Sequence, residues 1–146
     1  MNVPLLFDYR YARKYLTHTL MAGPKGSKYY DIFLDFSIYL KHKEDDHPVL
    51  TEEHFELLLN IGELGSLVAS AEKMRISYRK AWELVRQSEK TLGFQLIEKH
   101  RGGRDGGNSV LTPEGKKLID AYRELRVEFD SSVKRIVKDF FQTINK

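Results

Sequence analysis

Cationic, hydroxyl and aromatic side chains gather in one run of the chain, SYRKAWELVRQSEKTL at 77–92. An arginine can donate paired hydrogen bonds to guanine or phosphate, lysines and hydroxyl groups anchor phosphates, and a carboxylate can accept from cytosine. The side chains of this run that could do so are Ser77, Tyr78, Arg79, Lys80, Glu83 and Arg86. Any one of them alone could be an ordinary solvated residue. Their concentration in one segment predicts sequence-specific binding to double-stranded DNA.

The net charge indicates a polyanionic partner for the same part of the chain. Residues 65–112 hold nine Lys and Arg against five Asp and Glu, a net charge of +4, whereas the whole chain has 24 against 21, a net charge of +3. Positive charge is therefore concentrated around 77–92, and the rest of the chain is net negative. The further candidate DNA contacts in this region are Ser66, Lys99, Arg101 and Arg104.

Other kinds of chemistry find little support. The chain has no Cys, which excludes disulfides, thiolate zinc sites and cysteine nucleophiles. Its five His are scattered, and no nucleophile–base pair or paired carboxylates occur at a suitable spacing. We therefore predict that the protein is not an enzyme and has no catalytic residues, no metal site and no cofactor. The run HKEDDH at 42–47 is interpreted as a solvated turn, because no further ligand cluster could complete a metal site.

The chain also lacks membrane signals. No apolar run is long enough to span a bilayer, and the N-terminus lacks the basic-then-apolar order of a signal peptide. We expect a soluble, cytoplasmic protein. With 146 residues, 41% of them hydrophobic, the chain can bury one real core.

Two short helices are expected to position the candidate contacts. Residues 77–92 predict a helix with Ser77 as its N-cap and Gly93 just past its end. Its apolar side is formed by Ala81, Val85, Ser88 and Leu92. A shorter helix is expected at 66–75, capped by Ser66, and only a short turn separates the two. This arrangement is typical of a helix-turn-helix. Trp82 is expected to lie at the rim of the core and brace the neighbouring hairpin rather than contact a base.

Flanking elements complete a winged fold. Strict alternation over 29–41 predicts a β-strand, with a short return strand at 48–50, and Thr51 should cap a helix ending near 62–65. The glycine-rich run GGRDGGN at 102–108 lies between two short apolar segments, which predicts a β-hairpin wing. This run lacks the Lys-Ser/Thr ending of a phosphate-binding P-loop.

A final helix is predicted from Thr112 onward, with Pro113 in its first turn. Apolar residues recur every three or four positions to residue 144 and repeat every eleven, which keeps them on one face. A helix of about thirty residues is roughly 45 Å long, more than so small a domain can cover. We expect the same helix of a second copy to cover this face; coverage by the polar N-terminal strand region is the less favoured alternative. The predicted dimerisation residues are Leu118, Tyr122, Leu125, Phe129, Val133, Ile136 and Phe140.

These elements give a mainly α fold with a small β component, a winged helix-turn-helix with a long C-terminal dimerisation helix. The expected organisation is an arm at 1–28, mobile or loosely docked, the winged domain with its preceding strand at 29–112, and the long helix at 113–146.

With helix pair and wing in place, the chain resembles the N-terminal DNA-binding domain of molybdate-responsive (ModE-type) transcriptional regulators, relatives of the LysR winged helices. The residues that carry the resemblance are SYRKAW at 77–82, LIEK at 96–99, GGRDGG at 102–107 and LTPEG at 111–115. It covers about 37–122. A small residue usual in the helix-turn-helix turn of this family is replaced near Arg75. The chain ends at Lys146, where such regulators continue into molybdate-binding domains, so the resemblance implies DNA binding without a molybdate site in this chain.

We therefore predict a sequence-specific transcriptional regulator that binds double-stranded DNA as a homodimer. The alternative is a winged-helix module that binds protein partners and not DNA. Binding that falls steeply with salt would favour the first interpretation.

Overall fold

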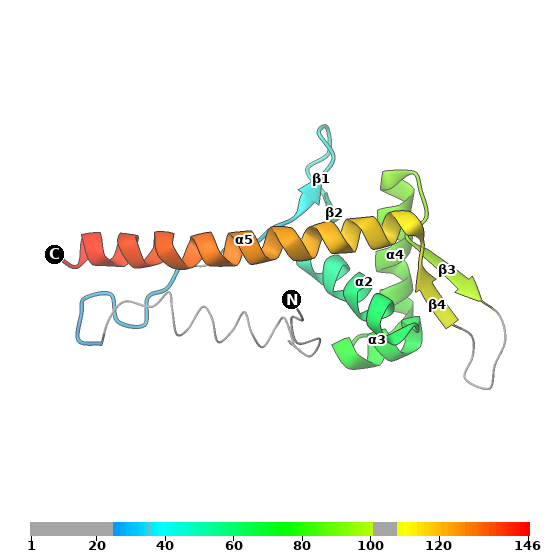
Figure 1. Cartoon of the computed structure of the whole chain (residues 1–146), viewed down its shortest axis with the longest axis horizontal. Helices are drawn as coiled ribbons and strands as arrows, with labels where there is room; N and C mark the ends of the chain where they lie inside the picture. Colours follow the sequence, from blue (N-terminus) through cyan, green and yellow to red (C-terminus); the bar gives the residue numbers. More distant parts are fainter. Residues whose placement is uncertain (1–24, 35, 101–107) are drawn as a thin grey trace. The chain divides into compact units, whose positions relative to one another are not determined.

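The computed structural model describes residues 25–34, 36–100 and 108–146. Within these ranges the fold is mainly α with two small antiparallel sheets, as the sequence predicts (Figure 1). Its elements are β1 (Leu40–Lys41), β2 (Pro48–Leu50), α2 (Glu52–Leu64), α3 (Leu67–Met74), α4 (Tyr78–Leu92), β3 (Ile97–His100), β4 (Asn108–Leu111) and α5 (Pro113–Ile144). The chain forms two compact units, Ser37–Glu124 and a second that combines residues up to Phe36 with Leu125–Lys146.

The helix ends in the first unit follow the sequence signals. The Oγ of Ser66 accepts from the amide of Ala69 at 3.1 Å, so Ser66 caps α3. Thr51 caps α2, and its amide donates to Nδ1 of His54 at 3.0 Å. Gly93 ends α4 with a left-handed φ of 82°, a conformation that costs glycine little. The predicted caps of α2, α3 and α4 are therefore confirmed.

One apolar core holds this unit together. The side chains of Leu50, Leu58, Ile61, Leu67, Leu96 and Ile119 are almost completely buried, and they come from β2, α2, α3, the segment before β3 and the first turns of α5. The rings of Phe55 and Tyr122 stack with centroids 3.8 Å apart. The first three turns of α5 therefore belong to the same core as the helix-turn-helix.

Gly115 allows α5 to start close to the hairpin. A Cβ on Gly115 would lie only 2.3 Å from the carbonyl oxygen of Leu96, which is closer than any side chain could approach. The amide of Gly115 donates to Oγ1 of Thr112 at 3.0 Å, which confirms Thr112 as the cap of this helix. The same hydroxyl donates to the carbonyl of Gln95 at 2.7 Å.

The predicted strand at 29–41 is wrong except for its last two residues. Regular pairing is limited to β1, where Leu40 pairs with Leu50. Alternation predicts a strand only when one face is buried, but Ile32 and Phe33, which should point to opposite faces, are 55% and 43% exposed. The pattern therefore does not correspond to a two-faced sheet.

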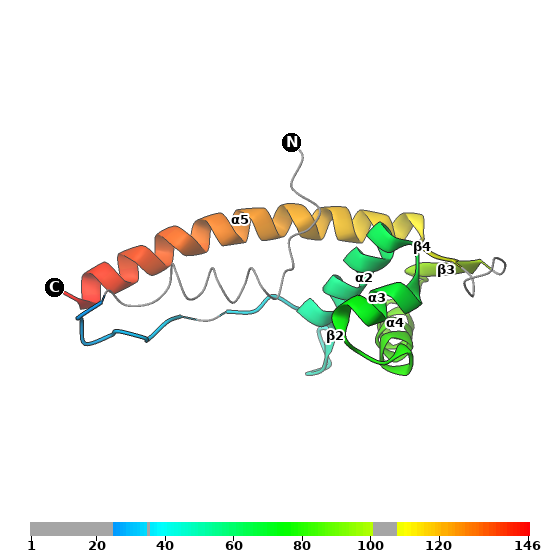
Figure 2. The same ribbon diagram turned by 90° about the horizontal axis from the view of Figure 1, so that it is seen from below.

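Part of this segment packs on α5 instead, within the second unit. Val137 and Phe141 of α5 are buried in a cluster with Tyr29, Leu34 and Phe36. The guanidinium of Arg126 lies 5.4 Å from the centroid of the Phe36 ring. The expectation that the N-terminal region leaves α5 uncovered is therefore wrong for one side of the helix. Figure 2 shows α5 as one continuous helix.

A second apolar row on α5 stays exposed. Its members recur at spacings of four and seven and so share one side of the helix; they are Leu125, Phe129, Ile136 and Phe140, with exposed fractions of 38%, 44%, 53% and 47%. We call these four residues the open stripe. Helix α5 thus carries two neighbouring apolar rows, and the described residues of the N-terminal segment cover one of them.

Candidate nucleic-acid interface

The helix-turn-helix consists of α3 and α4, joined by a tight turn in the first unit (Figure 2). Arg75 ends α3 in the left-handed conformation, with φ 57° and ψ 40°, and its amide donates to the carbonyl of Glu72. The amide of Ile76 donates to the carbonyl of Ala71. The turn therefore keeps its tight geometry although an arginine occupies it.

Helix α4 divides into a buried side and an outward side. Ala81, Leu84, Val85 and Ser88 are buried, which confirms the predicted apolar face and adds Leu84 to it. The Oγ of Ser88 donates to the carbonyl of Val49, which ties α4 to β2. On the opposite side of the helix lies an exposed row, which we call the outward row: Arg79, Glu83, Arg86 and Lys90.

The two arginines of the outward row are available for a ligand. Neither Arg79 nor Arg86 makes a hydrogen bond or ion pair with any residue in the described ranges. Glu83 accepts a long hydrogen bond, 3.4 Å, from the side-chain amide of Gln87. Two guanidinium groups two turns apart can therefore both face one ligand, with a carboxylate between them.

Other predicted contacts of α4 have partners within the fold. The Oγ of Ser77 accepts from the amide of Lys80 at 3.0 Å, so this hydroxyl caps the helix. The ammonium of Lys80 lies 3.0 Å from a carboxylate oxygen of Glu53 at the start of α2. Lys80 therefore points toward α2 and not along the outward row.

The wing is the antiparallel hairpin of β3 and β4. Ile97 pairs with Leu111 and Lys99 with Ser109, and the amide of Ser109 donates to the carbonyl of Gly65 at 3.0 Å. This bond fixes β4 against the turn between α2 and α3. The predicted contacts Arg101 and Arg104 lie in the tip, 101–107, which is outside the described residues.

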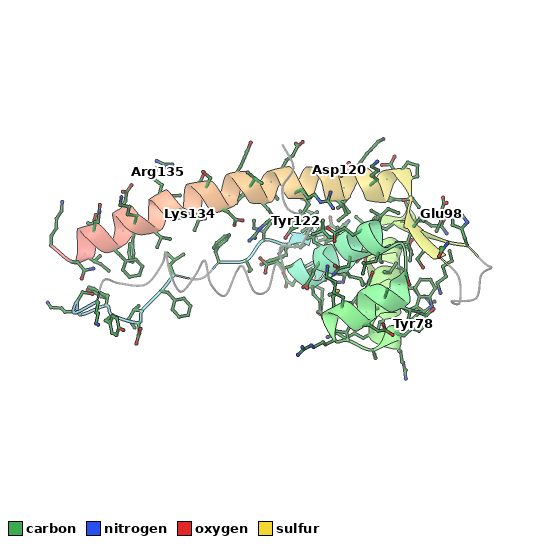
Figure 3. The ribbon with its side chains drawn as sticks, turned by 60° about the horizontal axis from the view of Figure 1, so that its bottom comes forward. Tyr78, Glu98, Asp120, Tyr122, Lys134 and Arg135 are labelled. Atoms are coloured by element: carbon green, nitrogen blue, oxygen red, sulfur yellow. The ribbon has the colours of Figure 1, made fainter. Side chains whose placement is uncertain are left out.

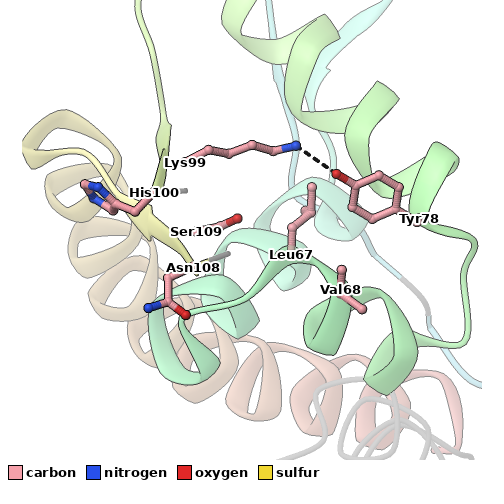
Figure 4. A pocket seen from close by; sticks show the side chains of 7 residues that line it. All are labelled: Leu67, Val68, Tyr78, Lys99, His100, Asn108 and Ser109. Carbon is pink, nitrogen blue, oxygen red and sulfur yellow. Dashed lines mark hydrogen bonds between the residues drawn. The ribbon is translucent and has the colours of Figure 1, made fainter. Parts of the chain in front are cut away.

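Lys99 connects the wing to α4. Its ammonium donates to the hydroxyl of Tyr78 at 2.7 Å (Figure 4). The same group lies 3.7 Å from the centroid of the Trp82 ring. Trp82 itself packs against the edge of the core, so its expected role in bracing the wing is confirmed. A small cavity of about 40 Å³ beside this contact is lined by Leu67, Val68, Tyr78, Lys99, His100, Asn108 and Ser109.

Two cations of this surface are missing from the sequence-based set. Lys90 extends the outward row by one turn, and its spacing of four from Arg86 is the signal that could have found it. Arg75 is exposed in the turn before α4. A positively charged residue in so short a turn is the signal that could have identified Arg75 as a candidate DNA contact.

The predicted dimerisation residues fall into two groups. Leu118, Tyr122 and Val133 pack within the chain, Tyr122 on Phe55 and Val133 beside Val137. Figure 3 marks Tyr122, which stacks on α2, and also Lys134 and Arg135 farther along α5. The other four predicted residues are the open stripe.

The described parts of the chain contain no group of three or more His, Asp or Glu side chains that could hold a metal ion. None of their helices is long and apolar enough to cross a membrane.

The chain is similar in sequence to known proteins over the part that forms the helix-turn-helix and the wing. Residues 53–116 match the family model described as bacterial regulatory helix-turn-helix protein, lysR family. The chain is 34% identical over 93 residues to the molybdenum-pterin-binding protein MopB of Rhodobacter capsulatus, across 64% of this chain and 33% of MopB. It is 30% identical over 92 residues to the molybdenum transport protein ModE of Azotobacter vinelandii, across 63% of this chain and 34% of that protein.

Among solved structures, the complex of the BenM DNA-binding domain with benA site 1 DNA is 26% identical, with a TM-score of 0.48, and covers 59% of this chain and 94% of that one. The chain spans about a third of the length of the curated relatives named above.

Proposed function

We propose that this chain, whose residues 53–116 match the family model of LysR-type helix-turn-helix proteins, is a transcriptional regulator that binds double-stranded DNA as a homodimer. The resemblance to ModE-type regulators is confirmed by the curated relatives. The observation that carries the proposal is the outward row of α4, which presents two arginines without partners in the described ranges on the side opposite the buried one.

A polyanion suits this row better than a protein surface does. Arginine offers paired donors that match guanine edges and phosphates, and an exposed helix fits the major groove. Arg79 and Arg86 would read bases or hold phosphates, Glu83 would accept from cytosine, and Lys90 would hold the backbone. Lys80 contributes less in this arrangement, because Glu53 already balances its charge at 3.0 Å.

The homodimer rests on the open stripe. A long apolar row on one helix marks a protein contact, and two copies related by a two-fold axis would place this row against itself. Beside the stripe, Glu128 and Arg135 lie on the same side of the helix, seven residues apart. Antiparallel packing about Ser132 would place Glu128 near Arg135 of the second copy.

The first experiment tests DNA binding. Purified protein is used to select fragments from the source genome, and the affinity for a recovered site is measured by fluorescence anisotropy at several salt concentrations. We expect a two-fold symmetric site and an affinity that falls steeply with salt. Protein that retains no DNA at low salt, but captures a protein partner without salt dependence, would contradict the proposal and favour the alternative module.

Matched variants locate the contact. Arg79→Ala should weaken binding and lower the slope of log affinity against log salt by about 0.9, the value for one lost phosphate contact. If Arg79 contacts a base instead, Arg79→Ala should weaken binding to the selected site and leave binding to unrelated DNA unchanged. Lys134→Ala removes an exposed cation from α5 and should leave both measurements unchanged. Equal effects of the two substitutions would count against a contact centred on α4.

A further inference from the structure

Within the described residues, the ammonium of Lys99 is held by aromatic side chains. Its Nζ lies 2.7 Å from the hydroxyl oxygen of Tyr78, 3.7 Å from the centroid of the Trp82 ring and 5.4 Å from the centroid of the Tyr78 ring. No carboxylate of the described residues forms an ion pair with it. The face of a tryptophan ring is the strongest cation–π partner among the side chains.

This contact joins β3 to the first turns of α4. Tyr78 and Trp82 are four residues apart on α4, and the Lys99 ammonium lies 5.4 Å and 3.7 Å from their ring centroids, so both rings share the side of the helix that faces the wing. Figure 4 shows the hydrogen bond between Lys99 and Tyr78. Two other hydrogen bonds hold the hairpin at different points: the amide of Leu96 donates to Glu89 at 2.7 Å, and that of Ser109 donates to the carbonyl of Gly65. Lys99 therefore fixes the wing next to the N-terminal end of the helix.

The direction of the hydrogen bond determines what Tyr78 can still do. An ammonium group can only donate, so the hydroxyl oxygen of Tyr78 is the acceptor. Its own proton is then available, and no other partner of this hydroxyl lies within the described ranges. A hydroxyl that accepts from a cation is polarised and becomes a stronger donor. Tyr78 is also 45% exposed at the start of α4.

We propose that Lys99 is a positioning residue that docks the wing on α4, and that the polarised hydroxyl of Tyr78 donates to a DNA phosphate. The proposal rests on DNA binding as the function. In this arrangement Tyr78 and Lys99 do not make two independent phosphate contacts. Lys99 holds Tyr78 in place, and only Tyr78 contacts the DNA backbone.

A double-mutant cycle on the full chain separates the two arrangements. Tyr78→Phe and Lys99→Met should each weaken binding to a selected site by about tenfold, because each removes the same charge-assisted contact. The double variant should bind no more weakly than either single variant. Independent contacts would multiply instead, to about a hundredfold. Such additivity would overturn the proposal.

The salt dependence gives a second readout. If Lys99 does not touch phosphate, Lys99→Met should leave the slope of log affinity against log salt nearly unchanged. A drop of about 0.9 would identify Lys99 as a direct phosphate contact and contradict the positioning role. Lys99→Arg should restore most of the affinity, because a guanidinium can stack on Trp82 and donate to Tyr78.

The docking itself can be measured without DNA. Trp82 is the one tryptophan of the chain, so its fluorescence reports on the group 3.7 Å above its ring. Lys99→Met should change the emission maximum and the quenching, whereas Lys99→Arg should change them little. Circular dichroism confirms that each variant is folded. An unchanged spectrum for folded Lys99→Met would refute the docking contact, even if the wild-type protein proved not to bind DNA.

Discussion

Helices α4 and α5 use their surfaces in opposite ways. On α4 the apolar side chains are buried in the core, and the side turned away from it carries three cations and a carboxylate. On α5, residues such as Val137 are buried against the chain, whereas the open stripe exposes two phenylalanines, a leucine and an isoleucine. Among the described residues, the apolar side of α4 is buried, whereas one apolar row of α5 is exposed. We infer that α4 faces a polar ligand and α5 faces another protein chain.

The largest expected effect comes from placing charge in the open stripe. Phe129→Asp combined with Ile136→Asp should weaken self-association by about a hundredfold or more, since burying each large apolar side chain contributes about 1.5–3 kcal/mol. Sedimentation velocity over a concentration series measures this change.

Val127→Asp is the matched control. Val127 is 62% exposed on α5, but it lies away from the stripe, so its replacement should leave the dimer intact. A monomeric wild-type protein, or equal dissociation of both variants, would contradict the inference that the open stripe of α5 contacts another protein chain.

Gly115→Ala tests whether the start of α5 is packed as completely as α4. The added Cβ would meet the carbonyl oxygen of Leu96 at 2.3 Å, and we expect a loss of about 1–3 kcal/mol in the free energy of unfolding. Urea denaturation measures it. Lys116→Ala changes the exposed neighbouring residue and should have little effect; equal stability of both variants would show that the first turn of α5 can shift freely.

Arg79→Lys and Arg86→Lys sharpen the assignment of the outward row. Lysine keeps the charge but loses the paired donors, so each change should weaken binding to a selected site by about tenfold while binding to unrelated DNA persists. Competition with unrelated DNA in the anisotropy assay measures this ratio. If the affinities for selected and unrelated DNA fall by the same factor, the arginines contact phosphates and do not contact bases.

The smallest effect concerns the start of α2. Burial lowers the pKa of His54 below its usual value of 6.5, although the nearby charge of Glu53 acts in the opposite direction. The unfolded chain therefore binds a proton more readily, and stability should fall as the pH drops below about 6.5 toward the lower pKa of the folded state.

His54→Gln provides the control for this pH dependence. Glutamine at this position can accept from the amide of Thr51, as in a capping box, but it does not titrate. Between pH 7 and pH 5, the melting temperature of this variant should therefore fall less steeply than that of the wild-type protein. Parallel curves would assign the pH dependence to other groups.

Local signals predicted most of the fold. Ser66, Ser77 and Gly93 mark helix ends through bonds within a few residues, so sequence alone was sufficient for α3 and α4. The alternation at 29–41 misled, because its period reports a sheet only if a neighbouring strand and a core face exist. The apolar periodicity of α5 also does not indicate which of its two rows packs against the described N-terminal residues.

The candidate site shows the same limit. The spacing of Arg79 and Arg86 predicts a shared face, since it follows from helix geometry. The contact between Tyr78 and Lys99 joins residues 21 positions apart, and nothing local in either segment indicates it. By sequence, Lys80 is as good a candidate DNA contact as its neighbours. Only the fold shows that Glu53 lies beside it and pairs with its charge.

Arg75 has a consequence for heat resistance. A side chain in the left-handed region strains the backbone by about 1 kcal/mol or more, and Arg75 holds a φ of 57° at the joint between α3 and α4. Glycine there would release the strain, offset in part by its greater freedom in the unfolded chain. The melting temperature of the domain is thus adjustable at one exposed joint, without changing any buried side chain.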